Sequence, residues 1–383
     1  VGSRRLMHLG FDGMNLLLLR RFAAEGIIPN FAELLRRGSS NRLLCTVPAW
    51  TPTNWASMLT GTSTGTHGLG GWSLRDKRDP WEKPRLRNED SRSMKADTIW
   101  EAGARAGLVS MASFFPASWP SRIPGGFVIA PGFRYPPFAL AFPELYIIGE
   151  TADAGREGGY GSRIDPVSTN LAETGSDAPV TYLEGTHAEL TVSGRHPSES
   201  LGSIRFDTGD RLWVSGGCSP SDYSEVHEDR WSKWLVGELL DEGNLHRVAF
   251  RVRLLKKESG TVHLIRSEAH RIDGFTDPPE LAPELVDRFG PFTGIFSVRP
   301  SPGEAELNAV LDEYRDQGLW MARVARHLLD TRGWDMHFCH WHLFDTINHA
   351  HVNPLDPEGP EYDAGRADWH LNAHRRAFMV ADE

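Results

Sequence analysis

The chain has 383 residues, of which 40% are hydrophobic and 24% charged, the balance of an ordinary globular protein. Its formal net charge of −10 at pH 7 argues against a nucleic-acid polymer as a partner, because proteins that bind one usually present a basic face. No apolar stretch reaches the roughly 18 residues that a membrane-spanning helix needs, so we expect no membrane span.

Residues 1–134 alternate strand-like and helix-like patterns. Residues 4–11 carry a short apolar run that ends at a turn signal, Asp12-Gly13. This run predicts a buried parallel strand that delivers the Asp12 carboxylate to the carboxyl edge of a sheet, where open α/β folds place their ligands. The elements expected next are helices over 16–24, 30–37 and 97–106, the last capped by Asp97, and a strand over 108–114. The alternation indicates a parallel sheet flanked by helices.

The segment TVPAWTPTNWASMLTGTSTGTHGLGGW, residues 46–72, places a Thr-Pro pair before a short helical pattern. Proline suits the first helical turn, so Thr51 is expected at the N-cap, beside the unpaired N–H groups that open the helix. Such a helix start favours anions, phosphate above all. Taken alone, the pair is better explained as an ordinary Thr N-cap. Together with Asp12 and the residues described next, its hydroxyl is placed to meet a phosphorus atom.

Residues 135–300 change character, and we expect them to form an insertion or cap on a core built by residues 1–134 and 301–383. Up to residue 205 Gly, Ser, Asp and Pro dominate, which predicts loops with short strands. Beyond that point the alternation is strand-like, and residues 247–255 and 261–267 are expected to pair antiparallel.

The carboxyl-terminal part returns to a helical pattern from Gly303 onward, followed by a strand that runs into WDMHFCHWHLFDTINH, residues 334–349. Asp345 and His349 are spaced i, i+4. On a helical turn both side chains therefore project to one side and can share a cation.

With these motifs in this order along the sequence, the chain resembles the type I phosphodiesterase/nucleotide pyrophosphatase branch of the alkaline phosphatase superfamily. The matching pieces are F-D-G at 11–13, T-P-T-N-W-A-S-M-L-T-G at 51–61 with H-G at 67–68, and D-T-I-N-H at 345–349. Weaker agreement covers residues 97–120 and 231–266, whereas residues 135–200 match poorly. The resemblance implies an α/β fold, a three-layer sandwich around a central, mostly parallel sheet, with an inserted cap subdomain.

The resemblance also implies a hydrolase of small phosphorylated molecules that uses two divalent metal ions. Zinc is the expected metal for both ions, and manganese is the alternative. One ion would be held by Asp12 and the Thr51 oxygen, the other by Asp345 and His349. A coordinated hydroxyl has a lowered pKa, so Thr51 would attack as an alkoxide and form a phosphothreonine intermediate. Asn54, one turn on, would hold a non-bridging phosphoryl oxygen.

Several further histidines stand near these motifs. His340 and His342 share one face of the expected strand. The family counterparts of the histidines His337, His340 and His342 are not ligands, so packing or supporting roles are expected for them. A structural role is expected for His67. Trp50 and Trp55 flank Thr51 and are candidates to line a pocket.

The family's site has three further ligands after the D-x-x-x-H motif, an Asp-His pair at the end of a later strand and another His. No Asp-His dipeptide follows Asp345, and His370 and His374 fall in the stretch 361–383, which is expected to be helical. The expectation is therefore a fragment that lacks part of the metal shell and has little or no activity alone.

Two alternatives stay open. Phosphonoacetate hydrolases share the Thr nucleophile, and a catalytically silent relative would bind a phosphorylated ligand or a partner. Sulfatases are disfavoured because they need a Cys or Ser in a C/S-x-P-x-R context, which the residues after Thr51 do not offer. Metal-dependent phosphoglycerate mutases typically use Ser, which counts against them too.

Overall fold

A mostly parallel sheet lies at the centre of the part of the chain that the computed structural model describes. That part comprises residues 5–74, 80, 86–87, 90–129, 138–149, 180–184, 187–193, 200–207, 212–215, 223–241, 243–258, 261–292, 294 and 303–383. The strand order is β1-β19-β4-β5-β18. The strands are β1 (Leu6–Phe11), β4 (Ser110–Ser113), β5 (Phe127–Ile129), β18 (Thr276–Asp277) and β19 (Met336–Trp341). The first four in this order run parallel and β18 runs antiparallel, which confirms the expected α/β class with a mostly parallel central sheet. The expected burial of the first strand is wrong: β1 lies at the edge of this sheet in the described residues, and its Leu6, Met7 and Leu9 side chains are exposed.

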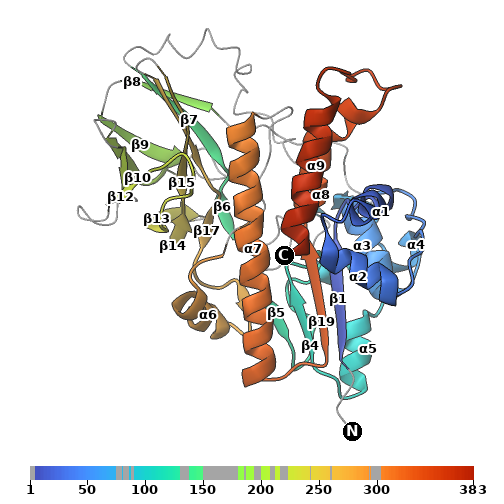
Figure 1. Ribbon diagram of the computed structural model, residues 1–383. Helices are drawn as coiled ribbons and strands as arrows, with labels where there is room; N and C mark the ends of the chain where they lie inside the picture. Colours follow the sequence, from blue (N-terminus) through green and yellow to red (C-terminus); the bar gives the residue numbers. More distant parts are fainter. Residues whose placement is uncertain are drawn as a thin grey trace.

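The side chains of the central strands alternate between two cores, as the two-residue period of a strand requires. On one face Ala112, Val128 and Phe338 pack against Trp55 and Trp100. On the other face lie the side chains Met111, Ile129 and Trp341. Helices cover both faces, so the sheet is the middle of three layers (Figure 1).

The helices of the two outer layers match the sequence pattern closely. One face carries α3 (Thr51–Thr60), α5 (Ile99–Arg105) and, next to α3, the short α4 (Thr64–His67). The other carries α1 (Leu16–Ala24), α2 (Pro29–Arg37), α6 (Leu281–Phe289), α7 (Glu304–Thr331), α8 (Leu343–His351) and α9 (Ala367–Asp382). Short 3-10 turns, η1 (Ser91–Ser93) and η2 (Asn353–Leu355), complete the helical elements of the described residues. The expected helices over 16–24 and 30–37 are confirmed within one residue.

The start of α5 lies one residue later than expected. Thr98, not Asp97, is its N-cap, since the Thr98 side chain accepts a hydrogen bond from the Glu101 N–H and the Glu101 carboxylate accepts one from the Thr98 N–H. This reciprocal capping box satisfies two N–H groups at once, which a cap at Asp97 would not do. Glu101 also pairs with Arg122, which ties the helix to the loop before β5.

The end of α9 caps the start of α2, two elements at opposite ends of the sequence. The Asp382 carboxylate accepts hydrogen bonds from the Asn30 N–H at 3.0 Å and the Phe31 N–H at 2.6 Å. Asp382 is almost fully buried there. A carboxylate at this place satisfies unpaired N–H groups and complements the helix dipole.

Three four-stranded sheets fill the described residues between β5 and α6, with the orders β13-β14-β17-β6, β15-β16-β7-β8 and β12-β11-β10-β9. Their strands are β6 (Ala139–Ala141), β7 (Glu144–Gly149), β8 (Val180–Glu184), β9 (His187–Ser193), β10 (Ser200–Asp207), β11 (Trp213–Ser215), β12 (Tyr223–Glu225), β13 (Leu235–Asp241), β14 (Asn244–Phe250), β15 (Val252–Glu258), β16 (Thr261–Arg266) and β17 (Ala269–Arg271). A separate two-stranded pair joins β2 (Ser73–Leu74) and β3 (Leu86–Arg87). The expected antiparallel pair is β15 with β16. Part of the loop region expected before residue 205, residues 150–179, lies outside the described residues.

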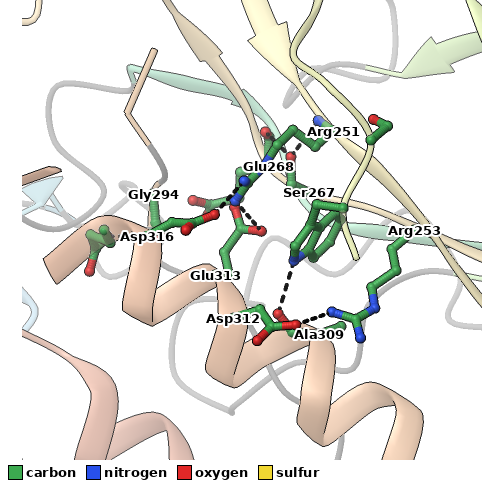
Figure 2. A network of polar contacts seen from close by, with 12 residues as sticks. Arg251, Arg253, Ser267, Glu268, Gly294, Ala309, Asp312, Glu313 and Asp316 are labelled. Carbon is green, nitrogen blue, oxygen red and sulfur yellow. Dashed lines mark hydrogen bonds and ion pairs between the residues drawn. The ribbon is translucent and has the colours of Figure 1, made fainter. Parts of the chain in front are cut away.

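The segment 135–300 is connected to the core in two ways. Its strand β18 pairs with β5 and so belongs to the central sheet. A polar network also joins its antiparallel strands to α7, which stands beside them (Figure 2). In this network Arg251 pairs with Glu313 at 3.0 Å and Asp316 at 2.5 Å, and Arg253 pairs with Asp312. In the described part of the chain, every helix is too short or too polar to cross a membrane.

Candidate active site

The carboxyl ends of β1 and β19 bring Asp12 against two histidines. In the parallel register Gly10 lies opposite His340, and the Asp12 N–H donates to the Trp341 carbonyl at 3.0 Å. Asp12 Oδ2 lies 3.1 Å from His340 Nε2 and 3.3 Å from His342 Nδ1. The expected position of Asp12 at the carboxyl edge of the sheet is therefore found, with histidines that sequence reasoning had assigned to packing or supporting roles.

The helix that follows β19 carries the other expected pair. Asp345 and His349 lie in successive turns of α8, and His349 Nε2 is 3.3 Å from Asp345 Oδ2. His342, at the N-cap of α8, places its Nε2 2.8 Å from the same oxygen. The single imidazole of His342 therefore bridges the Asp12 and Asp345 carboxylates.

A glycine allows α8 to approach β1 this closely. Gly13 has φ +76°, and a Cβ there would lie 2.7 Å from the Asp345 nitrogen. Both the left-handed backbone and the absence of a side chain are therefore needed at this position. The Asn348 side chain closes the contact by donating to the Gly13 carbonyl at 2.8 Å.

The charges in the site are strongly coupled. Burial would raise the pKa of Asp12, but hydrogen bonds with His340 and His342 outweigh it and hold that pKa well below its usual range. Burial is likewise outweighed at Asp345, where His342 and His349 lower the pKa. Burial alone would lower the pKa of His342, but the contacts of this ring with both carboxylates raise its pKa to about 9. The hydrogen bond to Asp345 raises the pKa of His349, whereas burial lowers that of His340. At neutral pH two carboxylates thus face each other across an imidazolium.

Helix α3 contacts the same edge of the sheet through Trp55. Trp55 Nε1 donates to Asp12 Oδ2 at 3.4 Å, so one face of α3 is turned toward Asp12. Thr51 precedes Trp55 by four residues and lies on that same face. Trp55 itself is buried against β-sheet side chains, whereas Trp50 is 41% exposed.

The expected N-cap role of Thr51 is wrong by one residue. Trp50 has the extended backbone of an N-cap, and its carbonyl accepts the first helical hydrogen bond, from the Asn54 N–H at 3.0 Å. Pro52 is compatible with the first or the second position of the helix, because the N–H groups of the whole first turn lack helical partners. Trp50, the N-cap residue, forms no side-chain capping hydrogen bond, and Thr51 is not in the capping position.

Asn54 is held to the loop that precedes α3. Its Oδ1 accepts from the Thr46 N–H at 2.8 Å, and its Nδ2 donates to the Trp50 carbonyl at 2.9 Å. These bonds fix the orientation of the amide beside the first turn of the helix.

His67 and His337 lie in structural contacts. His67 accepts from the Leu69 N–H at 3.1 Å and contacts the Ser57 hydroxyl at 2.8 Å, which locks the turn after α3. His337 contacts the Ser113 hydroxyl at 3.0 Å between β19 and β4. His340 and His342 differ because they face Asp12. The two-residue spacing of His340 and His342 at a strand end indicated that both could face the site. That they face Asp12 could be inferred only from the register of β19 with β1.

Comparisons with known proteins agree with the sequence motifs. Residues 6–174 match the family model described as type I phosphodiesterase / nucleotide pyrophosphatase, which confirms the resemblance. No curated protein matches the chain. Two solved structures of a phosphonoacetate hydrolase from Sinorhizobium meliloti 1021, with phosphonoacetate and with phosphonoformate, align at 22% and 23% identity with a TM-score of 0.27. Each alignment covers 29% of this chain and only 27% of the solved chain.

Proposed function

Residues 6–174 match the type I phosphodiesterase/nucleotide pyrophosphatase family, and from this premise we propose that the protein is a phosphoester hydrolase with Thr51 as its nucleophile. One observation supports the proposal: Trp55, four residues after Thr51 on α3, donates to Asp12 at 3.4 Å, at the edge where Asp345 also lies. A hydroxyl in the first turn of this helix, near two ionised carboxylates as the Trp55 contact suggests, would suit metal-assisted phosphoryl transfer.

The residues present fit the divalent ions that the family implies. Carboxylate oxygens and imidazole nitrogens are good ligands for zinc and manganese. Asp12 with the Thr51 oxygen would hold one ion, and Asp345 with His349 would hold the other. Such ions, when bound, lower the pKa of a coordinated hydroxyl and neutralise charge on phosphoryl oxygens.

The chain's own residues then divide the chemistry between them. Thr51 Oγ1 gives up its proton to water and forms a bond to phosphorus while the bond from phosphorus to the leaving oxygen breaks, and the released oxygen takes up a proton from water. The Asn54 amide, already oriented by Thr46 and Trp50, donates its second N–H to a non-bridging phosphoryl oxygen. A water molecule finally attacks the phosphothreonine, and the Thr51 hydroxyl is restored.

The antiparallel sheets of residues 135–300 are proposed to act as a cap that shapes substrate access. Their polar contacts with α7 and the pairing of β18 with β5 support a fixed rather than loosely tethered position. The substrate is proposed to be a small phosphate ester, and the walls of this region would decide which one.

The proposal is tested by hydrolysis of bis-p-nitrophenyl phosphate in the presence of zinc or manganese. In a protein that also carries the three further ligands of the family's site, release of p-nitrophenol is expected from the wild type and from Thr51→Ser, which keeps the hydroxyl, but not from Thr51→Ala. The 383 residues alone, for which little or no activity is expected, serve as the comparison. Acid quenching and peptide mass spectrometry should locate the covalent phosphoryl group on Thr51. Equal rates for the wild type and Thr51→Ala would refute the nucleophile. Phosphonoacetate in the same assay tests cleavage of a carbon–phosphorus bond.

A further inference from the structure

Two buried histidines in the site have no role in the mechanism above. His340 is 1% exposed in its side chain and His342 11%, and both turn a ring nitrogen toward Asp12. His340 is the second-last residue of β19, on the face of the sheet that carries Trp55, and His342 follows the strand as the N-cap of α8. Two imidazoles, two residues apart at one strand end, thus converge on one carboxylate.

The spacing of the three polar atoms suits a single metal ion. A ligand oxygen of Asp12 and a ring nitrogen from each of His340 and His342 all lie within 4.8 Å of one another. In a tetrahedral zinc site with bonds of about 2.0–2.1 Å, neighbouring ligand atoms lie about 3.3 Å apart. The distances of 3.1 and 3.3 Å from Asp12 Oδ2 to the two nitrogens match that edge.

The surroundings of His342 resemble those of a metal ligand. While its Nδ1 faces Asp12, its Nε2 pairs with Asp345 at 2.8 Å. A carboxylate on the second ring nitrogen fixes the orientation of a ligating histidine and raises its basicity.

The charge balance points the same way. Asp12 and Asp345 are 14% and 22% exposed in their side chains, and buried carboxylates need positive charge nearby. Among the residues that the structure describes, no Lys or Arg forms an ion pair with either one. Their partners are imidazole rings, and a divalent cation bound at His342 Nδ1 in place of a proton would supply two positive charges where the imidazolium supplies one.

We infer that Asp12 Oδ2, His340 Nε2 and His342 Nδ1 bind one divalent transition-metal ion, with Asp345 orienting His342 from outside the coordination sphere. Three protein ligands leave an open position for a substrate or nucleophile oxygen. The inference rests on the proposed function for the catalytic use of this ion, whereas the binding itself needs only these residues.

The test measures metal binding directly, with the full 383-residue chain depleted of metal and titrated with Co²⁺, followed by competition with Zn²⁺. The wild type is expected to develop the visible absorption of low-symmetry Co²⁺. His340→Ala and His342→Ala should each lose one equivalent of bound Co²⁺ and its absorption, whereas Asp345→Asn should keep this equivalent with an affinity lowered about 10–100-fold, the cost of losing an outer partner. The control His227→Ala removes a histidine elsewhere and should bind Co²⁺ as the wild type does.

A conservative variant separates ligation from folding. His340→Gln keeps the size of the side chain and an N–H donor for Asp12 but is a poor zinc ligand, so it should fold in the presence of a chelator and still lose the Co²⁺ spectrum. Unchanged Co²⁺ affinity and absorption in His340→Gln or in both alanine variants would overturn the inference. Failure of the Thr51 nucleophile would appear instead in the turnover of Thr51→Ala, so the two results are read separately.

Discussion

We expect the free energy of unfolding of this protein to fall as the pH drops below neutrality. Replacing His374 by leucine should make that fall smaller. His374 lies on α9, is 1% exposed, and belongs to a cluster with His351 at the end of α8 and His370 one turn earlier. Burial lowers its pKa from 6.5 to about 4, with a smaller contribution from His370 and an opposing one from a hydrogen bond with the His351 backbone. The folded protein therefore keeps this ring neutral at a pH where the unfolded chain protonates it.

The sign follows from the direction of that shift. Between pH 6.5 and pH 4 His374 binds more protons in the unfolded state than in the folded state. Its contribution to the free energy of unfolding is therefore fully present above pH 6.5 and falls as the pH drops. One pKa unit is worth about 1.4 kcal/mol, so the contribution of His374 to the free energy of unfolding falls by about 2 kcal/mol between pH 7.5 and pH 5.0.

Urea unfolding followed by tryptophan fluorescence at the two pH values measures this difference. The wild type should lose about 2 kcal/mol more than His374→Leu on going from pH 7.5 to pH 5.0. The control Phe378→Leu, a buried apolar position on the same helix, should lower stability at both pH values and keep the wild-type pH dependence. The reasoning is refuted when the wild type and His374→Leu show the same pH dependence.

Further predictions concern the polar network, two glycines and the metal. Arg251→Met should cost about 3–5 kcal/mol in urea unfolding because Glu313 stays buried without the guanidinium, whereas the double variant with Glu313→Leu should recover most of it; equal losses would contradict this. Gly126→Ala should be severely destabilising, since its Cβ would lie 2.1 Å from the Ser110 carbonyl oxygen. Gly103→Ala meets only the flexible end of a methionine and gains about 0.5–1 kcal/mol of helix propensity, so its melting temperature should change far less; similar melting temperatures would count against the packing argument. Zinc at 100 times its dissociation constant should add about 2.7 kcal/mol of stability over a chelated sample, and the absence of any shift in melting temperature would contradict specific binding.

Much of the fold could be predicted because its signals are local. The apolar run before Asp12, the helix from Leu16 to Ala24 and the i, i+4 pair in α8 each depend on neighbours within a few residues. The N-caps of α3 and α5, Trp50 and Thr98, each lie one residue from the expected position, because the carbonyl and side-chain partners that decide between adjacent residues are not visible in the sequence.

Other features depend on contacts between distant parts of the chain. The approach of His340 and His342 to Asp12 follows from the parallel register of β1 with β19, which no local pattern specifies. The same holds for β18, whose two residues join the central sheet from within the expected insertion. Sequence reasoning therefore found the carboxylates of the site but not the imidazoles between them.

The capping of α2 by Asp382 has a consequence for the order of events during synthesis. The two partners are separated by 352 positions. At about 5–20 residues per second, the ribosome needs about 20–70 s to deliver Asp382 after α2 has emerged. Throughout that interval the amino-terminal segment lacks both this cap and β19, the neighbour of β1. We therefore expect the nascent first helices to be a binding site for chaperones and a target for proteases until α9 is made.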